Sequence, residues 1–251
     1  MGLPFDDGWT IPFDSPHYPP LPAQYRHVRT QIVPFRADPA AVARLLPEPL
    51  VGDPDGRCVA IGLRVPSSSA YGAFDEAVVE LACTLDGRPG WYCSHVLHNG
   101  PRGIAAGREI YGTPKIYCQF AVRIAGPVME IRASMDLFPV MTITTTTPTP
   151  IPAPELPDLR PSWRLKVIPR ADGPGPALKQ LVDAGDANSE VTIHESLRGT
   201  GSVWFGTAPL LDLAPLAPVS PSADDEAFVV EDSFLEGFGR IELDYLAEGR
   251  R

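Results

Sequence analysis

Thirty prolines and 22 glycines, spread over most of the 251 residues, are the feature that most limits how this chain can fold. Proline breaks helices because it lacks an amide hydrogen and its ring clashes with the preceding turn, and glycine is a poor helix former. Breakers spaced this closely leave room for short strands and turns, but not for long helices. We therefore expect a mainly β fold.

The segments between these breakers are short apolar runs, many of them rich in β-branched and aromatic residues. They predict strands at Arg26–Phe35, Cys58–Val65, Ala77–Thr84, Trp91–Leu97, Lys115–Ile124, Val128–Met135, Val140–Thr146, Arg164–Ile168, Glu190–Leu197, Val203–Phe205, Ala227–Val230 and Gly239–Tyr245. One helix is expected to follow the N-cap Asp38 and reach Leu46, and another to span Pro176–Ala184. Many strands with few helices predict a mainly β (α+β) protein built as a closed antiparallel β-barrel with appended short helices.

The length and the 44% hydrophobic content fit a single domain, residues 1–251, with a substantial core. Residues 1–24 are rich in proline and aromatic residues and show no period. We expect them to form an N-terminal arm that wraps the surface or contacts another subunit.

The net charge of −10, without a cluster of lysines and arginines, predicts a protein that binds neither nucleic acid nor an anionic membrane surface. A small anionic substrate is still compatible with it, because a single arginine can bind a carboxylate. No apolar run approaches the roughly 20 residues of a membrane helix, and we expect a soluble cytoplasmic protein. The cysteines form no CxxC pair and are expected to be reduced and buried: Cys58, Cys83, Cys93 and Cys118.

The lysine at position 115 stands in an unusual place, directly after Pro114 and at the start of an apolar run. Burial of a lysine lowers the pKa of its amine, and a neutral amine can attack a carbonyl to form a Schiff base. In a strand, Lys115 would share one face with Tyr117 and Gln119, opposite the apolar face. Taken alone, the pattern fits a solvated lysine at a sheet edge better, because buried lysines are rare.

Other chemistry is less well supported. The segment CSHVLH contains Cys93, His95 and His98, but His98 falls on the opposite strand face from the other two, and no second Cys or His cluster supports a metal site. His98 precedes the loop that leads to Lys115 and can lie near the same pocket. The sequence has no GxSxG elbow and no phosphate-binding loop with its lysine.

Several segments together resemble the acetoacetate decarboxylase superfamily. The run GIAAGREIYGTPK, which ends at Lys115, is similar to the family signature, whose lysine forms a Schiff base with the substrate. YGAFDE, which ends at Glu76, resembles the segment whose glutamate lines the active site, and VRT around Arg29 resembles the site of the carboxylate-binding arginine. Two further segments also resemble the family: RLKVIPR (Arg164–Arg170) and the tail Asp232–Leu246.

This resemblance implies a cofactor-free and metal-free enzyme that acts on a small keto acid and assembles into a homo-oligomer. Lys115 would be the nucleophile, Glu76 an acid/base or positioning group, and Arg29 the binder of the substrate carboxylate. The implied reaction is decarboxylation of a β-keto acid through a lysine imine, a carbon–carbon lyase reaction.

Two departures from the family pattern keep alternatives open. Ile116 stands where the decarboxylases carry a second lysine, and Ile61 where they carry a pocket carboxylate. Family members with altered pockets perform aldol, dehydration or cyclisation chemistry on 2-oxo acids without losing the carboxylate. A barrel that binds a keto acid without turnover is the non-enzymatic alternative. Which keto acid is bound, the oligomer number and the pathway cannot be determined from these residues.

Overall fold

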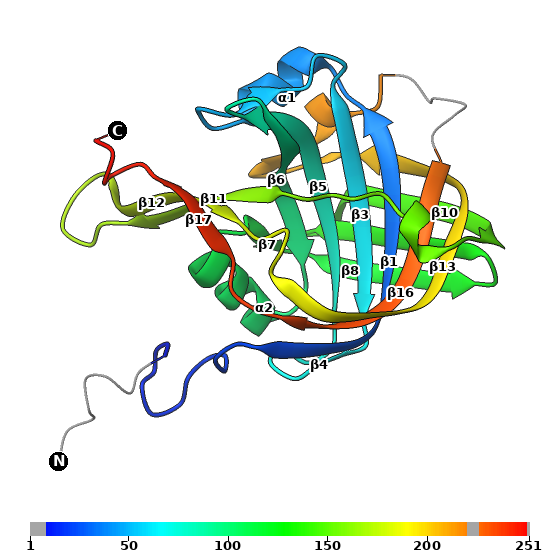
Figure 1. Cartoon of the computed structure of the whole chain (residues 1–251), viewed down its shortest axis with the longest axis horizontal. Coiled ribbons are helices and arrows are strands. Elements are labelled where there is room, and N and C mark those ends of the chain that lie inside the picture. The colour runs from blue at the N-terminus through cyan, green and yellow to red at the C-terminus, as the bar shows by residue number, and fades with distance from the viewer. Residues whose placement is uncertain (1–8, 220–225, 250–251) are drawn as a thin grey trace.

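A computed structural model describes residues 9–219 and 226–249, and it shows one large, strongly bent sheet with few helices (Figure 1). The strands are β1 Ala23–Arg36, β2 Val51–Gly52, β3 Arg57–Val65, β4 Ser67–Ser68, β5 Phe74–Leu85, β6 Arg88–His98, β7 Lys115–Tyr117, β8 Gln119–Ala125, β9 Val128–Met135, β10 Phe138–Pro150, β11 Ser162–Pro169, β12 Pro176–Asp183, β13 Asn188–Phe205, β14 Thr207–Ala208, β15 Leu211–Asp212, β16 Glu226–Glu236 and β17 Arg240–Asp244. The α-helices are α1 Pro39–Leu45 and α2 Pro101–Ala106, the latter continued by the π-helix η2 Gly107–Tyr111; the 3₁₀ turns are η3 Ala153–Glu155 and η4 Ala214–Leu216.

The main sheet is open and mixed, so the predicted closed antiparallel barrel is wrong. Among the described residues, the strand order runs β17-β12-β11-β6-β5-β3-β1-β16-β13-β10-β9-β8, and strands β17 and β8 are its two ends. Strand β6 makes parallel pairs at both of its ends, with β11 and with β7. The predicted strand Lys115–Ile124 is interrupted at Cys118: β7 pairs with β6 and β8 pairs with β9, so no continuous strand joins these two parts of the sheet.

Most of the predicted strands are confirmed, and Val128–Met135 has the predicted bounds. The helix after Asp38 is also confirmed, since the Asp38 carboxylate accepts a hydrogen bond from the amide of Ala40. The predicted helix Pro176–Ala184 is wrong, because this segment is strand β12, paired with β11 and β17. Backbone hydrogen bonds to two neighbouring strands outweigh the weak local helix preference of this short segment.

Two large apolar clusters and two small ones fill the interior of the described part of the chain. The larger includes the fully buried Trp163, Leu81 and Met141, and it holds all the cysteines except Cys93, which packs in a separate small cluster. All four cysteines are buried and free, as predicted. The second of the two clusters is aromatic and contains Tyr25, Tyr71 and Phe74.

The N-terminal arm is described only from residue 9, since residues 1–8 of the predicted arm lie outside the described part of the chain. Trp9 contacts the rings of Tyr18 and Phe238 edge-on. The hydroxyl of Tyr18 donates a hydrogen bond of 2.6 Å to Glu109, which belongs to the π-helix η2. The arm is thereby attached to the helix that borders the candidate site. Within the described residues, no helix is long and apolar enough to span a bilayer.

Candidate active site

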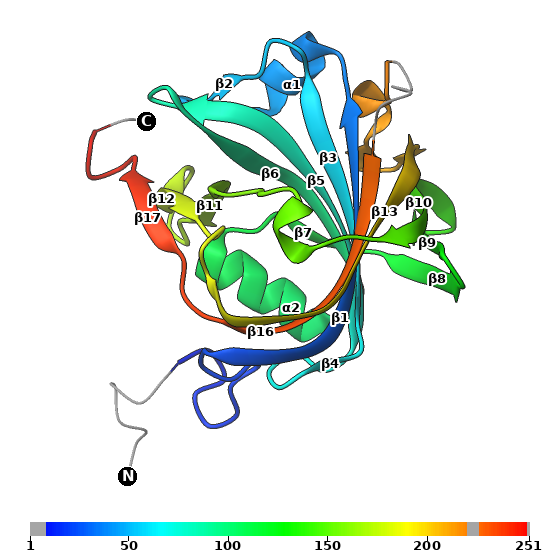
Figure 2. The ribbon, with the colours of Figure 1, turned by 45° about the vertical axis from the view of Figure 1, so that its right-hand side comes forward.

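A cavity of about 190 Å³ lies beside the aromatic cluster and the helix pair α2–η2. Figure 2 shows this helix pair in the hollow of the bent sheet, between β6 and the ribbon of β1, β13 and β16. The charged residues that line the cavity are Glu76, Lys115, Arg164 and Glu236. Its aromatic walls are Tyr25, Tyr71, Phe74, Tyr111 and Phe234. The cavity is thus a small space in which charged groups converge between aromatic walls, a combination found in small-molecule sites.

Lys115 points into this cavity from the first residue of β7, and its side chain is only 13% exposed. The loop before it turns at Gly112, which has φ of 78°. A Cβ at Gly112 would lie 2.3 Å from the Cα of Lys166, so only glycine fits this turn. Gly107 of η2 faces the lysine stem, where a Cβ would lie 2.7 Å from the lysine Cε. Gly107 therefore leaves room for the lysine stem, and Gly112 permits the turn that precedes it.

Glu76 is the direct partner of this lysine. Its Oε2 atom lies 2.7 Å from the Nζ of Lys115, and its side chain is also 13% exposed. Burial by itself would raise the pKa of Glu76, but the charge of Lys115, followed by the interaction with His98, outweighs burial and lowers it. Glu76 is therefore a carboxylate that can hold an ammonium ion or accept a proton from it.

His98 lies behind Glu76 as its cross-strand neighbour, fully buried and stacked on Phe74 at 4.3 Å. Its Nδ1 accepts a hydrogen bond of 2.7 Å from the amide of Gly100, so the ring proton is assigned to Nε2. Nε2 lies 3.5 Å from Oε2 of Glu76. Burial, and then the nearby Lys115, lower the pKa of His98 to about 3, so the imidazole is neutral. Among the described residues, no group of histidine, cysteine and carboxylate side chains could hold a metal ion.

Glu236, at the end of β16, is a cavity carboxyl that sequence reasoning missed. It accepts a hydrogen bond of 3.1 Å from the hydroxyl of Tyr25. Burial raises the pKa of Glu236, and the charge of Lys115 offsets only part of this effect. The only sequence signal was its place in the tail that resembles the family. Nothing in the local pattern indicated that this tail would reach Lys115.

The two arginines of interest occupy different places. Arg29 is not among the described residues that line the cavity; it lies 3.3 Å from Glu195 and 3.6 Å from Glu231. The structure therefore brings Lys115 and Glu76 together but leaves Arg29 apart from them, and its predicted carboxylate-binding role stays a prediction. Arg164 of β11 does line the cavity. Its only signal in the sequence was its place in the segment RLKVIPR, which resembles a family segment.

The two tyrosines near the lysine also differ. Tyr111 is buried and lines the cavity, and its hydroxyl donates a hydrogen bond to the carbonyl of Gly237. Tyr117 is 56% exposed and is not among the described lining residues. Tyr111 is therefore a pocket wall and Tyr117 a surface residue.

Comparison with known proteins gives a consistent result. A family model described as acetoacetate decarboxylase matches residues 10–232. The chain is 29% identical to acetoacetate decarboxylase 2 of Mesorhizobium japonicum, covering 95% of this chain and 90% of the relative. It is 28% identical to the acetoacetate decarboxylase of Chromobacterium violaceum, with 96% of each chain covered.

Solved structures share the fold. The chain in a structural study of acetoacetate decarboxylase has a TM-score of 0.87 at 22% identity, with 97% of this chain and all of that chain covered. The enduracididine biosynthesis enzyme MppR, complexed with pyruvate, has a TM-score of 0.79 at 20% identity, with coverage of 95% and 98%. At this level of identity the structural similarity establishes the fold alone.

Proposed function

The chain belongs to the acetoacetate decarboxylase family, and from that premise we propose that it is a Schiff-base enzyme in which Lys115 condenses with a small keto acid. The observation that carries this proposal is the pairing of Lys115 with Glu76 inside a small cavity. A buried lysine beside a carboxylate has a nearby proton acceptor, which the amine needs before it can attack a carbonyl.

The proposed reaction is decarboxylation of a β-keto acid. The Lys115 amine adds to the ketone carbon, water leaves, and a cationic imine forms. The bond to the carboxylate then breaks, and its electron pair moves to the imine nitrogen as carbon dioxide departs. Protonation of the resulting enamine carbon and hydrolysis of the imine release the ketone and restore Lys115. Glu76 would take the ammonium proton at the start and position the nitrogen afterwards. The imine itself is the electron sink, so these steps require no cofactor.

A second candidate is chemistry on a 2-oxo acid that keeps its carboxylate, as in aldol addition or dehydration. Glu236 is the observation that favours it, because it places a second carboxyl in the cavity, with its pKa raised by burial. Burial favours the protonated form of this carboxyl, and a protonated carboxyl could donate a proton to a leaving hydroxyl. This candidate uses the same lysine imine and differs only in the bond that breaks.

Borohydride reduction tests the shared step. With acetoacetate or pyruvate present, reduction should attach the ligand to the Lys115 peptide, as mapped by mass spectrometry. The Lys115→Met variant should not be labelled, and labelling spread over surface lysines would contradict the proposal. Release of carbon dioxide from acetoacetate then identifies the decarboxylase. A condensation product formed from pyruvate and an aldehyde identifies the second candidate. Labelling without turnover of either substrate would identify a binding protein.

A further inference from the structure

Arg164 lines the cavity and, unlike many of the other arginines in the described part of the chain, has no close carboxylate partner. Its side chain is partly buried and borders the cavity that contains Lys115. Among the described residues, no carboxylate oxygen forms an ion pair with it within 4.0 Å, whereas Arg29, Arg57 and Arg88 each have such a partner. An arginine without a close carboxylate in a cavity is free to bind one that comes from outside.

The guanidinium is held from behind by neutral groups. Its Nη1 donates hydrogen bonds to the carbonyl oxygen of Ser162 at 2.9 Å and to the hydroxyl oxygen of Ser162 at 3.1 Å. That hydroxyl donates in turn to both carboxyl oxygens of Glu80, at 2.9 and 3.0 Å. Glu80 is only 4% exposed, so solvent hardly competes for these bonds. The chain Glu80–Ser162–Arg164 fixes the arginine at one edge and leaves its other edge for a ligand.

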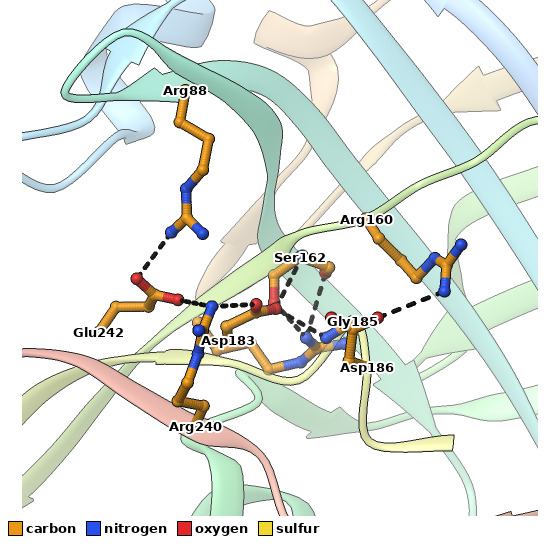
Figure 3. Close-up of polar contacts among 9 residues, drawn as sticks. Arg88, Arg160, Ser162, Asp183, Gly185, Asp186, Arg240 and Glu242 are labelled. Carbon is orange, nitrogen blue, oxygen red and sulfur yellow. Dashed lines mark hydrogen bonds and ion pairs between the residues drawn. The ribbon is translucent and has the colours of Figure 1, made fainter. Parts of the chain in front are cut away.

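The strand start that carries Ser162 is itself held in place. The carboxylate of Asp183 accepts hydrogen bonds from the amides of Ser162 and Gly185, at 3.2 and 2.9 Å. Arg240 lies 3.6 Å from Asp183 and also pairs with Glu242 (Figure 3). These contacts join β11, β12 and β17 at the point where Arg164 enters the cavity, and they limit the movement of its backbone.

The other charged groups that line the cavity do not neutralise the positive charge of Arg164. Glu76 is already the close partner of Lys115. Burial raises the pKa values of both Glu80 and Glu236, which favours their neutral forms. An arginine keeps its charge at any ordinary pH, so the cavity has a persistent positive charge that a monoanion would balance.

We infer that Arg164 is the carboxylate subsite of this cavity, that it binds the carboxylate of a keto acid whose carbonyl reacts with Lys115, and that Ser162 and Glu80 are its positioning residues. The inference rests on the proposed function for the imine step, but not on which bond breaks later. The family resemblance indicates Arg29 as the carboxylate-binding residue, whereas this inference assigns the carboxylate to Arg164.

Paired ligands test this inference. Imine formation at Lys115 is measured by borohydride trapping with two anions, acetoacetate and pyruvate, and with two neutral ketones, acetone and acetylacetone. The Arg164→Met variant should need about ten- to a hundredfold more of either anion for half-maximal trapping, the loss expected for hydrogen bonds to a charged group. Trapping of the neutral ketones should change less than about threefold, and this also shows that the variant is folded.

Three further variants sharpen the result. Ser162→Ala should give a smaller loss, confined to the anions, because it removes one of the two bonds to the arginine. Arg57→Met, a surface control far from the cavity, should behave as the wild type. The inference is overturned if Arg164→Met affects anions and ketones equally, or if Arg29→Met is the variant that loses the anions.

A second measurement separates this inference from the imine proposal. Pyruvate should raise the thermal unfolding temperature of the wild type and not that of Arg164→Met, whether or not an imine forms. If borohydride gives no labelling, and pyruvate still stabilises the wild type but not Arg164→Met, the imine proposal fails and the subsite stands. If pyruvate stabilises both proteins equally, the subsite fails.

Discussion

The ammonium nitrogen of Lys115 lies 2.7 Å from Oε2 of Glu76, although their strands β7 and β5 are not neighbours. Strand β6 lies between them and pairs with both. The two side chains therefore meet across a strand, beside His98 at the end of β6. This arrangement holds an amine and a carboxylate together without any contact that is local in the sequence.

Replacing Glu76 with glutamine should slow turnover without preventing all imine formation. The amide cannot accept the lysine proton, and a positioned proton acceptor contributes about 10²- to 10⁴-fold to such reactions. We expect kcat to fall by about that factor, while slow trapping at Lys115 remains. Steady-state kinetics and borohydride labelling measure the two effects. A variant as fast as the wild type would show that Glu76 only neutralises the lysine.

Replacing Gly107 with alanine should displace the lysine. The new Cβ would lie 2.7 and 2.8 Å from Cε and Cδ of Lys115, so the flexible lysine stem must move. A misplacement of about 1 Å can reduce a rate about a hundredfold, and we expect a loss of that order with little change in the unfolding temperature. Gly173→Ala is the matched control, since no atom lies within 4 Å of its added Cβ. Equal activity of the two variants would contradict the prediction.

His98 should make the protein sensitive to acid. Its pKa is about 3 in the folded state against an ordinary value of 6.5, so the unfolded chain binds its proton first as the pH falls. The neutral, buried His98 therefore costs no stability above pH 6.5, and the unfolding free energy falls progressively as the pH drops from 6.5 towards 3. Between pH 7.5 and 5 the wild type should lose about 2 kcal/mol more unfolding free energy than His98→Gln, as measured by urea denaturation.

The matched control for this prediction is His17→Gln, because His17 is an exposed histidine of the arm. It should lose as much stability in acid as the wild type does. If His98→Gln follows the same pH dependence as His17→Gln, the folded protein does not exclude the proton from His98.

Replacing Ile116 with lysine should destabilise the fold and should not speed up imine formation. Ile116 packs against the main apolar cluster, on the side of β7 away from the cavity, so a new ammonium there cannot reach the Lys115 amine. We expect a loss of about 1–3 kcal/mol in unfolding free energy. Ile124→Lys, at a position that is 45% exposed on β8, should lose little stability. Faster trapping in Ile116→Lys would show that a neighbouring charge can activate the amine in this protein.

Local sequence determined much of the framework. Proline and glycine spacing gave the mainly β character, and the alternation of side chains along a strand placed Lys115 and Ile116 on opposite faces, as the structure has them. The N-cap Asp38 located the start of α1. These features depend on neighbouring residues along the chain, which is why they could be read from the sequence.

Tertiary structure decided the rest. Whether the sheet closes depends on which strands share hydrogen bonds, and the break at Cys118 became visible only when β7 paired with β6 and β8 with β9. Arg164 and Glu236 reach the cavity because the sheet bends β11 and β16 toward η2, and nothing near either residue in the sequence encodes that approach. Contacts between segments far apart in the chain are set by packing and by the burial of charge. A site whose charged groups come from four strands could therefore be predicted only where single residues carried a local signal.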